Sequence, residues 1–131
     1  MNFEGMLKNN ALENKTILIT GGGTGLGKSI GKYCVELGAN LIITSRKLEV
    51  LDETAQELSK LGPGEILPLS SDVRNVDEVE KTIKTSLNKF GKIDCLLNNA
   101  AGNFISPTEM LSQNAFKAVI DIVLMGTWNC T

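Results

Sequence analysis

Residues 16–27 read TILITGGGTGLG, a short apolar run followed by five glycines within seven positions. Residues 16–20 are expected to form a buried strand, because the run is too short for a helix and contains β-branched residues. The glycines then occupy a turn between this strand and a helix that should end near Gly38. The apolar residues at three- and four-residue steps, which we expect on the inner face of that helix, are Leu26, Ile30, Tyr33, Cys34 and Leu37.

The same order of strand and helix repeats along the rest of the chain. Further buried strands are expected at residues 40–45, 66–70 and 93–98. Helical patterns follow them and are bounded by Gly62, Asn75, Gly91 and Ser112. Four such units predict an α/β fold, a Rossmann-type doubly wound parallel sheet with strand order 3-2-1-4.

The last helical pattern has no visible end. Its apolar stripe consists of Phe116, Val119, Ile120, Val123, Leu124 and Trp128, and at Thr131 no cap, glycine or proline brings the pattern to an end. Sheets of this kind usually have more than four strands. We therefore expect residues 1–131 to be the front part of a single domain whose C-terminal half is missing.

Length and composition fit one soluble globular domain, with 131 residues of which 42% are hydrophobic and 21% charged. A net charge of -2 with scattered Lys and Arg argues against nucleic acid or an anionic membrane as partner. The three cysteines lie far apart and there is no histidine, so we predict no metal site. No apolar stretch is long enough for a signal peptide or membrane span. We expect a reducing, cytoplasmic location, with the mitochondrial matrix and the peroxisome as open alternatives.

The glycine turn is expected to bind phosphate. Glycines there let the backbone approach a pyrophosphate and leave the unpaired N–H groups of the helix pointing at it. The predicted binding residues are Gly21, Gly22, Gly23, Thr24, Gly25 and Leu26. The spacing is T-G-x-x-x-G-x-G, but residues 22–29 also make a formal Walker A match, so a nucleoside triphosphate site stays open at this point.

The end of the second strand indicates which dinucleotide the turn would hold. Ser45, Arg46 and Lys47 stand where an NAD site would present a carboxylate to the adenosine ribose. Two cations and a hydroxyl instead suit a 2′-phosphate, which the guanidinium of Arg46 can bind through two hydrogen bonds. We therefore predict NADPH/NADP rather than NAD as the cofactor.

Two further segments complete a resemblance to a known family. Asp72-Val73 follows the third strand, and residues 98–102, NNAAG, follow the fourth. With the glycine turn, these segments span nearly the whole chain and resemble the short-chain dehydrogenase/reductase family, which makes the Walker A match a chance overlap. The resemblance implies that Asp72 and Val73 hold the adenine. It also implies that the nicotinamide ribose is lined by Asn99, Ala100, Ala101 and Gly102.

One segment narrows the resemblance to a branch of the family. Residues 98–109, NNAAGNFISPTE, and residues 121–127, DIVLMGT, are similar to the 2,4-dienoyl-CoA reductase branch. Val123 stands where the wider family normally has an asparagine of a proton relay, which argues against ordinary carbonyl chemistry. The resemblance implies a homotetramer that reduces 2,4-dienoyl-CoA to 3-enoyl-CoA with NADPH, in unsaturated fatty acid β-oxidation.

The same resemblance implies roles for residues outside the nucleotide site. Asn103 would be a catalytic donor to the thioester oxygen. Arg74, Phe104 and Ser112 match positions that contact the acyl-CoA, and the family's tyrosine and lysine would lie beyond Thr131. Three alternatives stay open: a trans-2-enoyl-CoA reductase, a carbonyl (3-ketoacyl) reductase, and a non-catalytic NADP-binding fragment.

Overall fold

The computed structural model describes residues 7–131, so residues 1–6 of the predicted domain lie outside the described residues. The strands are β1 (Thr16–Thr20), β2 (Asn40–Ser45), β3 (Ile66–Ser70) and β4 (Cys95–Leu97). They form one sheet in the order β3-β2-β1-β4, and each neighbouring pair is parallel. The predicted fold class and strand order are therefore confirmed.

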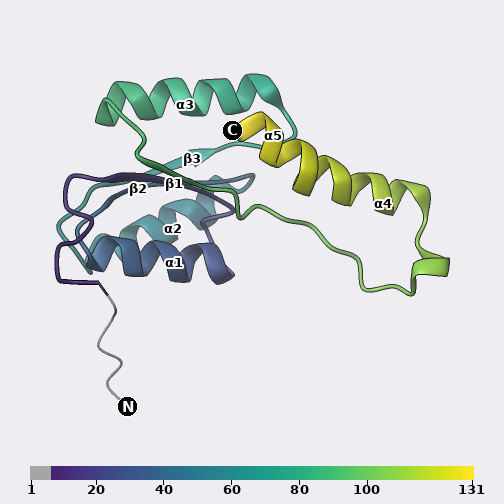
Figure 1. Ribbon diagram of the computed structural model, residues 1–131, viewed down its shortest axis with the longest axis horizontal. Helices are drawn as coiled ribbons and strands as arrows, with labels where there is room; N and C mark the ends of the chain where they lie inside the picture. The colour runs from purple at the N-terminus through teal and green to yellow at the C-terminus, as the bar shows by residue number, and fades with distance from the viewer. Residues whose placement is uncertain (1–6) are drawn as a thin grey trace, which may run out of the picture.

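Helices cover both faces of this sheet. The helices are α1 (Gly25–Glu36), α2 (Leu48–Leu58), α3 (Val76–Phe90), α4 (Gln113–Ile120) and α5 (Gly126–Cys130), with a 3-10 turn η1 (Thr108–Met110) and a π-helical turn η2 (Asp121–Met125). Figure 1 shows α1 and α2 on one face and α3 on the other, while α4 and α5 form one rod that leads away from the sheet. Within residues 7–131, no helix combines the length and the apolar character needed to cross a membrane.

The main core lies between the two central strands and the helices α1 and α2. It consists of Ile17, Ile19, Cys34, Val35, Ala39, Leu41, Ile43, Leu51 and Leu58. Every residue of β1 and the four central residues of β2 are buried. Burial on both faces explains why these strands are continuous apolar runs rather than alternating patterns.

The predicted inner face of α1 is wrong in part. Leu26, Ile30 and Tyr33 are 76%, 40% and 41% exposed. The buried residues of the helix are Gly27, Gly31, Cys34 and Val35. A Cβ atom at Gly31 would lie 3.0 Å from Leu41 Cδ2, a tight contact with a side chain, so a small residue suits the close approach of the helix to β2. The helix packs against the sheet through its small residues. The prediction chose its most hydrophobic residues, and these lie on a neighbouring face of the helix.

The fourth strand is shorter than predicted, because Asp94 makes different contacts from a strand residue. The Asp94 N–H donates to the carbonyl of Thr16 at 2.8 Å. Its carboxylate in turn accepts the Thr16 N–H at 2.8 Å. A side chain therefore takes the place of a ladder partner at the start of β4, and regular pairing with β1 begins at Cys95.

The last predicted helix exists, but it is interrupted. Ser112 caps it as predicted, since its hydroxyl accepts the N–H of Ala115 at 3.2 Å. The π-helical turn η2 then separates α4 from α5. Several residues of the predicted apolar stripe are exposed in the described part of the chain, namely Phe116, Val123, Leu124 and Trp128.

Candidate functional site

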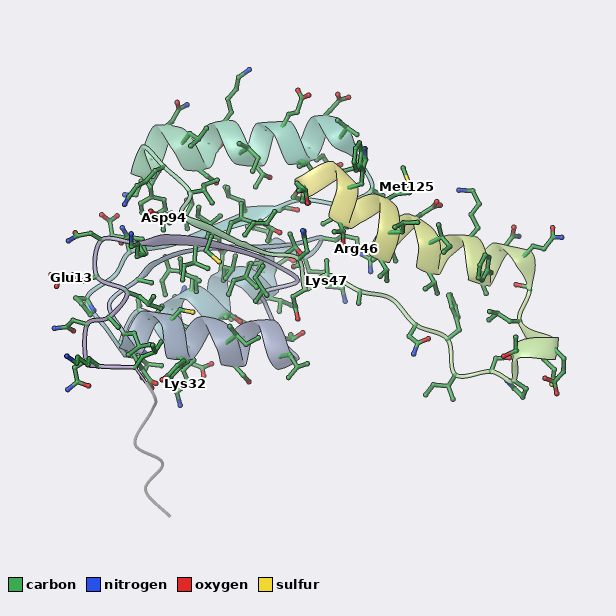
Figure 2. All side chains as sticks on the ribbon, in the orientation of Figure 1. Glu13, Lys32, Arg46, Lys47, Asp94 and Met125 are labelled. Carbon is green, nitrogen blue, oxygen red and sulfur yellow. The ribbon has the colours of Figure 1, made fainter. Side chains whose placement is uncertain are left out.

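A cavity of about 460 Å³ lies at the carboxyl ends of the strands. It is lined by Gly21, Thr24, Leu26, Thr44, Ser45, Arg46, Ser71, Asp72, Val73, Arg74, Asn99, Ala100, Ala101 and Ile122. In open α/β sheets, ligands bind outside the carboxyl ends, where the strand order reverses, and here that point lies between β1 and β4. Figure 2 shows Arg46 and Lys47 at this end of the sheet, near the rod of C-terminal helices.

The glycine turn is shaped by contacts that exclude side chains. Gly21 and Gly25 adopt φ of +66° and +54°, which glycine tolerates best. A Cβ atom at Gly27 would lie 2.4 Å from the carbonyl oxygen of Gly21, and one at Gly22 would lie 2.7 Å from Ile43 Cγ2. The turn therefore packs directly against the start of α1 and against β2, as a phosphate-binding turn requires.

Asn99 joins the end of β4 to the end of β1. Its side-chain amide donates to the carbonyls of Thr20 at 3.0 Å and Gly21 at 3.2 Å. The Thr20 hydroxyl accepts the N–H groups of Asn99 at 3.0 Å and Ala100 at 2.9 Å. These bonds fix the turn and the NNAAG segment against each other, so both predicted binding segments face one cavity.

The segment after β2 presents a cation to the cavity. Arg46 is exposed and lines it, next to Ser45. The Ser45 hydroxyl accepts the N–H of Lys47 at 3.3 Å, which turns the chain into α2. Lys47 itself precedes α2 and does not line the cavity. Of the two cations in this segment, Arg46 is therefore the one that lines the cavity.

Asp72 and Arg74 form a closed pair beside Arg46. Arg74 Nε donates to both Asp72 carboxylate oxygens, at 2.9 and 3.1 Å, and Arg74 Nη2 donates to Oδ2 at 2.5 Å. The Arg74 N–H donates to Oδ1 at 3.0 Å. The hydrogen bonds from the Arg74 side chain hold the pKa of Asp72 below its usual value. Asp72 is therefore ionised, and the hydrogen bonds from Arg74 already engage both of its carboxylate oxygens.

The C-terminal rod touches this site from the other side. Asn129 on α5 donates its side-chain amide to the carbonyl of Val73 at 2.9 Å. A Cβ atom at Gly126 would lie 2.5 Å from Val73 Cγ2, so the helix packs closely there. Ile122, inside the π-helical turn, lines the cavity. Such turns are frequent at functional sites, and this one places a side chain over the predicted nicotinamide end.

The structure does not bring all predicted residues to the cavity. The predicted site residues that do not line it are Gly22, Gly23, Gly25, Lys47, Gly102, Asn103, Phe104 and Ser112. The side-chain carbonyl of Asn103 accepts the N–H of Phe104 at 2.8 Å, which leaves its amide N–H groups as side-chain donors. Phe104 is 49% exposed, and both residues lie on an extended segment before α4.

The geometry also bears on the formal Walker A match. Lys28 Nζ donates to Glu57 Oε2 on α2 at 2.5 Å, and Lys28 does not line the cavity. Gly27 lies inside α1 rather than in a loop. A P-loop lysine must reach the phosphates. The arrangement therefore argues against a nucleoside triphosphate site.

Sequence reasoning missed several residues of the site. Thr44, Ser71 and Ile122 line the cavity without having been predicted, and Thr20 holds Asn99 and Ala100 in place. Thr20 begins the T-G motif, so the motif itself could have indicated it. The other three follow only from the three-dimensional proximity of strand ends and the C-terminal rod.

Comparisons with known proteins show what the chain as a whole is similar to. The family model described as short chain dehydrogenase matches residues 15–131. A Bacillus subtilis (strain 168) protein named as a probable 2,4-dienoyl-CoA reductase, (2E)-enoyl-CoA-producing, is 43% identical over 92% of this chain and 47% of its own length. The peroxisomal 2,4-dienoyl-CoA reductase, (3E)-enoyl-CoA-producing, of Rattus norvegicus is 44% identical over 90% of this chain and 40% of its own length.

A solved structure shows a similar fold. The crystal structure of a short chain dehydrogenase from Bacillus anthracis matches with a TM-score of 0.83 and 46% identity. The match covers 89% of this chain and 48% of that one. The chain thus spans less than half the length of these relatives.

Proposed function

This chain belongs to the short chain dehydrogenase family, and from that premise we propose that it binds NADPH and serves the reduction of 2,4-dienoyl-CoA to 3-enoyl-CoA. Membership of the family implies an oxidoreductase with a nicotinamide cofactor. The names of the two curated relatives support the dienoyl-CoA substrate. The preference for NADPH rests on the charges of the cavity.

One observation carries the proposal: the glycine turn and Arg46 face the same cavity. The turn and the start of α1 offer N–H groups to a pyrophosphate. The charged residues that line the cavity are Arg46, Asp72 and Arg74, and the last two neutralise each other. Arg46 is then the cation left for a 2′-phosphate, and no carboxylate on β2 opposes it.

The proposed reaction begins with the hydride that NADPH supplies to the δ-carbon of the dienoyl thioester. The electron pair of the diene moves to the thioester oxygen as a dienolate, and a proton then adds at the α-carbon to give the 3-enoyl product. A dienolate needs hydrogen-bond donors at its oxygen. The free amide N–H groups of Asn103 make it the residue that we propose for this role.

The acyl-CoA would extend from Asn103 along the segment that carries the other predicted substrate residues. We propose that Phe104 covers the acyl chain, since its ring is half exposed on this segment. We propose that Ser112, at the start of α4, and Arg74 contact the CoA moiety. To bind a phosphate of the substrate, the Arg74 guanidinium would have to release the Asp72 carboxylate.

The full-length protein tests this function through NADPH oxidation with three thioesters. A 2,4-dienoyl-CoA should be turned over, and a trans-2-enoyl-CoA and a 3-ketoacyl-CoA should not. Product analysis should then find the 3-enoyl isomer, whereas a 2-enoyl product would match the name of the Bacillus subtilis relative. Turnover of the ketoacyl substrate alone would refute the proposal. Saturable binding of NADPH without turnover of any thioester would favour a binding role.

Quaternary state and location stay predictions. We propose a homotetramer, which light scattering of the purified protein measures directly. A bacterial and a peroxisomal relative match this chain to nearly the same degree, so they do not favour one compartment. We keep the cytoplasm as the expected location, to be checked by microscopy of the tagged protein.

A further inference from the structure

The glycine turn contains carbonyl groups as well as N–H groups, and the structure shows what holds those carbonyls. Asn99 binds the carbonyls of Thr20 and Gly21. The carbonyl of Gly23 instead accepts a 2.7 Å hydrogen bond from the hydroxyl of Thr54. Thr54 lies on α2, 31 residues away, and the proposed reaction does not involve it.

Thr54 occupies a position where an apolar residue would be expected. Its side chain is 2% exposed, on the buried face of α2 between Leu51 and Leu58. A buried hydroxyl costs free energy unless it forms a hydrogen bond, whereas valine has nearly the same shape without that cost. The bond to Gly23, rather than packing, is therefore the physical reason for a hydroxyl at this position.

This bond fixes the orientation of one peptide group in the turn. In a planar trans peptide, the C=O and the N–H point in opposite directions. Because the Gly23 carbonyl points toward α2, the N–H of Thr24 points away from α2. Thr24 lines the cavity and immediately precedes α1, where unpaired N–H groups attract phosphate.

Thr54 also connects the two ends of the proposed nucleotide site. Its helix, α2, begins at Leu48, directly after the segment that contains Arg46. Leu51 on the same helix packs near Gly23, because a Cβ atom there would lie 3.3 Å from Leu51 Cδ2. The helix thus places the guanidinium at its start while it holds the glycine turn through Thr54.

We infer that Thr54 is a positioning residue for the pyrophosphate of the dinucleotide. It acts by holding the Gly23 carbonyl and thereby directing the next N–H toward the ligand. The inference rests on the proposed binding of NADPH. It makes a specific claim: removal of this hydroxyl should weaken ligands that contain a pyrophosphate, and it should spare a ligand that carries only the 2′-phosphate.

The test compares NADPH with adenosine 2′-monophosphate on the full-length protein. Thr54→Val should raise the dissociation constant of NADPH about three- to tenfold, the equivalent of one ordinary hydrogen bond. The dissociation constant of adenosine 2′-monophosphate should stay unchanged, because this ligand reaches Arg46 but not the turn. Thr54→Ser, which keeps the hydroxyl, should restore NADPH binding. Thr82→Val, the same substitution at a buried threonine of α3, should leave both ligands unaffected.

The outcomes separate this inference from the proposed function. If the original protein does not bind NADPH, both fall. If it binds NADPH and Thr54→Val binds it equally well, the positioning role alone is wrong. Equal weakening of both ligands would also refute it, since that pattern indicates general loosening. Should Thr54→Val be too unstable to purify, Thr54→Cys keeps the volume with a weaker donor, and the same selective loss is expected.

Discussion

Replacement of Gly27 by alanine tests whether the glycine turn is built by close packing. The added Cβ atom would lie 2.4 Å from the Gly21 carbonyl oxygen, 2.7 Å from Asn99 Nδ2 and 3.0 Å from Gly22 Cα. Two of these three neighbouring atoms belong to the backbone, so no side-chain rotation can relieve the contacts with them. The turn must therefore move away from α1 to make room.

The expected size of the effect follows from two opposing contributions. Overpacking of this kind costs about 1–3 kcal/mol. Alanine in a helix interior offsets about 1 kcal/mol of that, because glycine is a poor helix former. The net loss of stability should then be as much as about 2 kcal/mol. The displaced Gly21 carbonyl also loses its bond to Asn99, so NADPH should bind about tenfold more weakly or worse.

Gly31→Ala is the matched control on the same buried face. There the Cβ atom would meet Leu41 Cδ2 at 3.0 Å, and a flexible side chain can shift by the small amount required. The gain in helix propensity should offset the contact, so stability should change by less than about 0.5 kcal/mol. Urea unfolding and NADPH titration of both variants form the assay. Gly27→Ala behaving like Gly31→Ala in both measurements would refute the close-packing argument.

Three further predictions concern charged side chains, two that line the cavity and one at the start of β4. Arg46→Ala should weaken NADPH about 10- to 100-fold while NADH binding stays the same, and equal losses for both coenzymes in titrations would contradict the assigned 2′-phosphate contact. Arg74→Gln should weaken NADPH binding, because it leaves the Asp72 carboxylate unneutralised beside Arg46 and the phosphates of the ligand; unchanged or tighter binding in the same titrations would contradict this account of the pair. Bonding to the Thr16 N–H lowers the pKa of Asp94, so this carboxylate stabilises the fold above about pH 4 and loses that contribution as the pH falls through its lowered pKa. Asp94→Asn should therefore flatten the acid side of the unfolding curve, and an unaltered pH profile would exclude the contribution.

The fold could be predicted because its strands are buried on both faces. Residues 16–20 and 40–45 are continuous apolar runs, and the sheet order followed from the repeated units and the handedness rule. The cavity at the carboxyl ends followed from the same topology, with the glycine turn and Arg46 in it. These features depend on local patterns, which a single sequence displays directly.

The errors have a different origin. The face of α1 was misplaced because Gly27 and Gly31 allow close approach to the sheet, and a scale of hydrophobicity cannot register the absence of a side chain. The interruption at η2 was missed because a π-helical turn changes the period locally without any change in residue type. For α1, the contacts that decide the buried face join residues that are distant in the sequence.

The same physical distinction separates the residues that bind from those that hold the binding backbone. A turn that binds phosphate through its N–H groups must also satisfy the carbonyls of those same peptides, and glycine has no side chain with which to do so. Asn99 and Thr54 supply these bonds from 78 and 31 residues away. A motif defined by glycine spacing therefore describes the turn but not the side chains that hold its carbonyls. Those side chains are amide and hydroxyl donors on neighbouring elements. Their loss should change the affinity for the pyrophosphate more than it changes the stability of the fold.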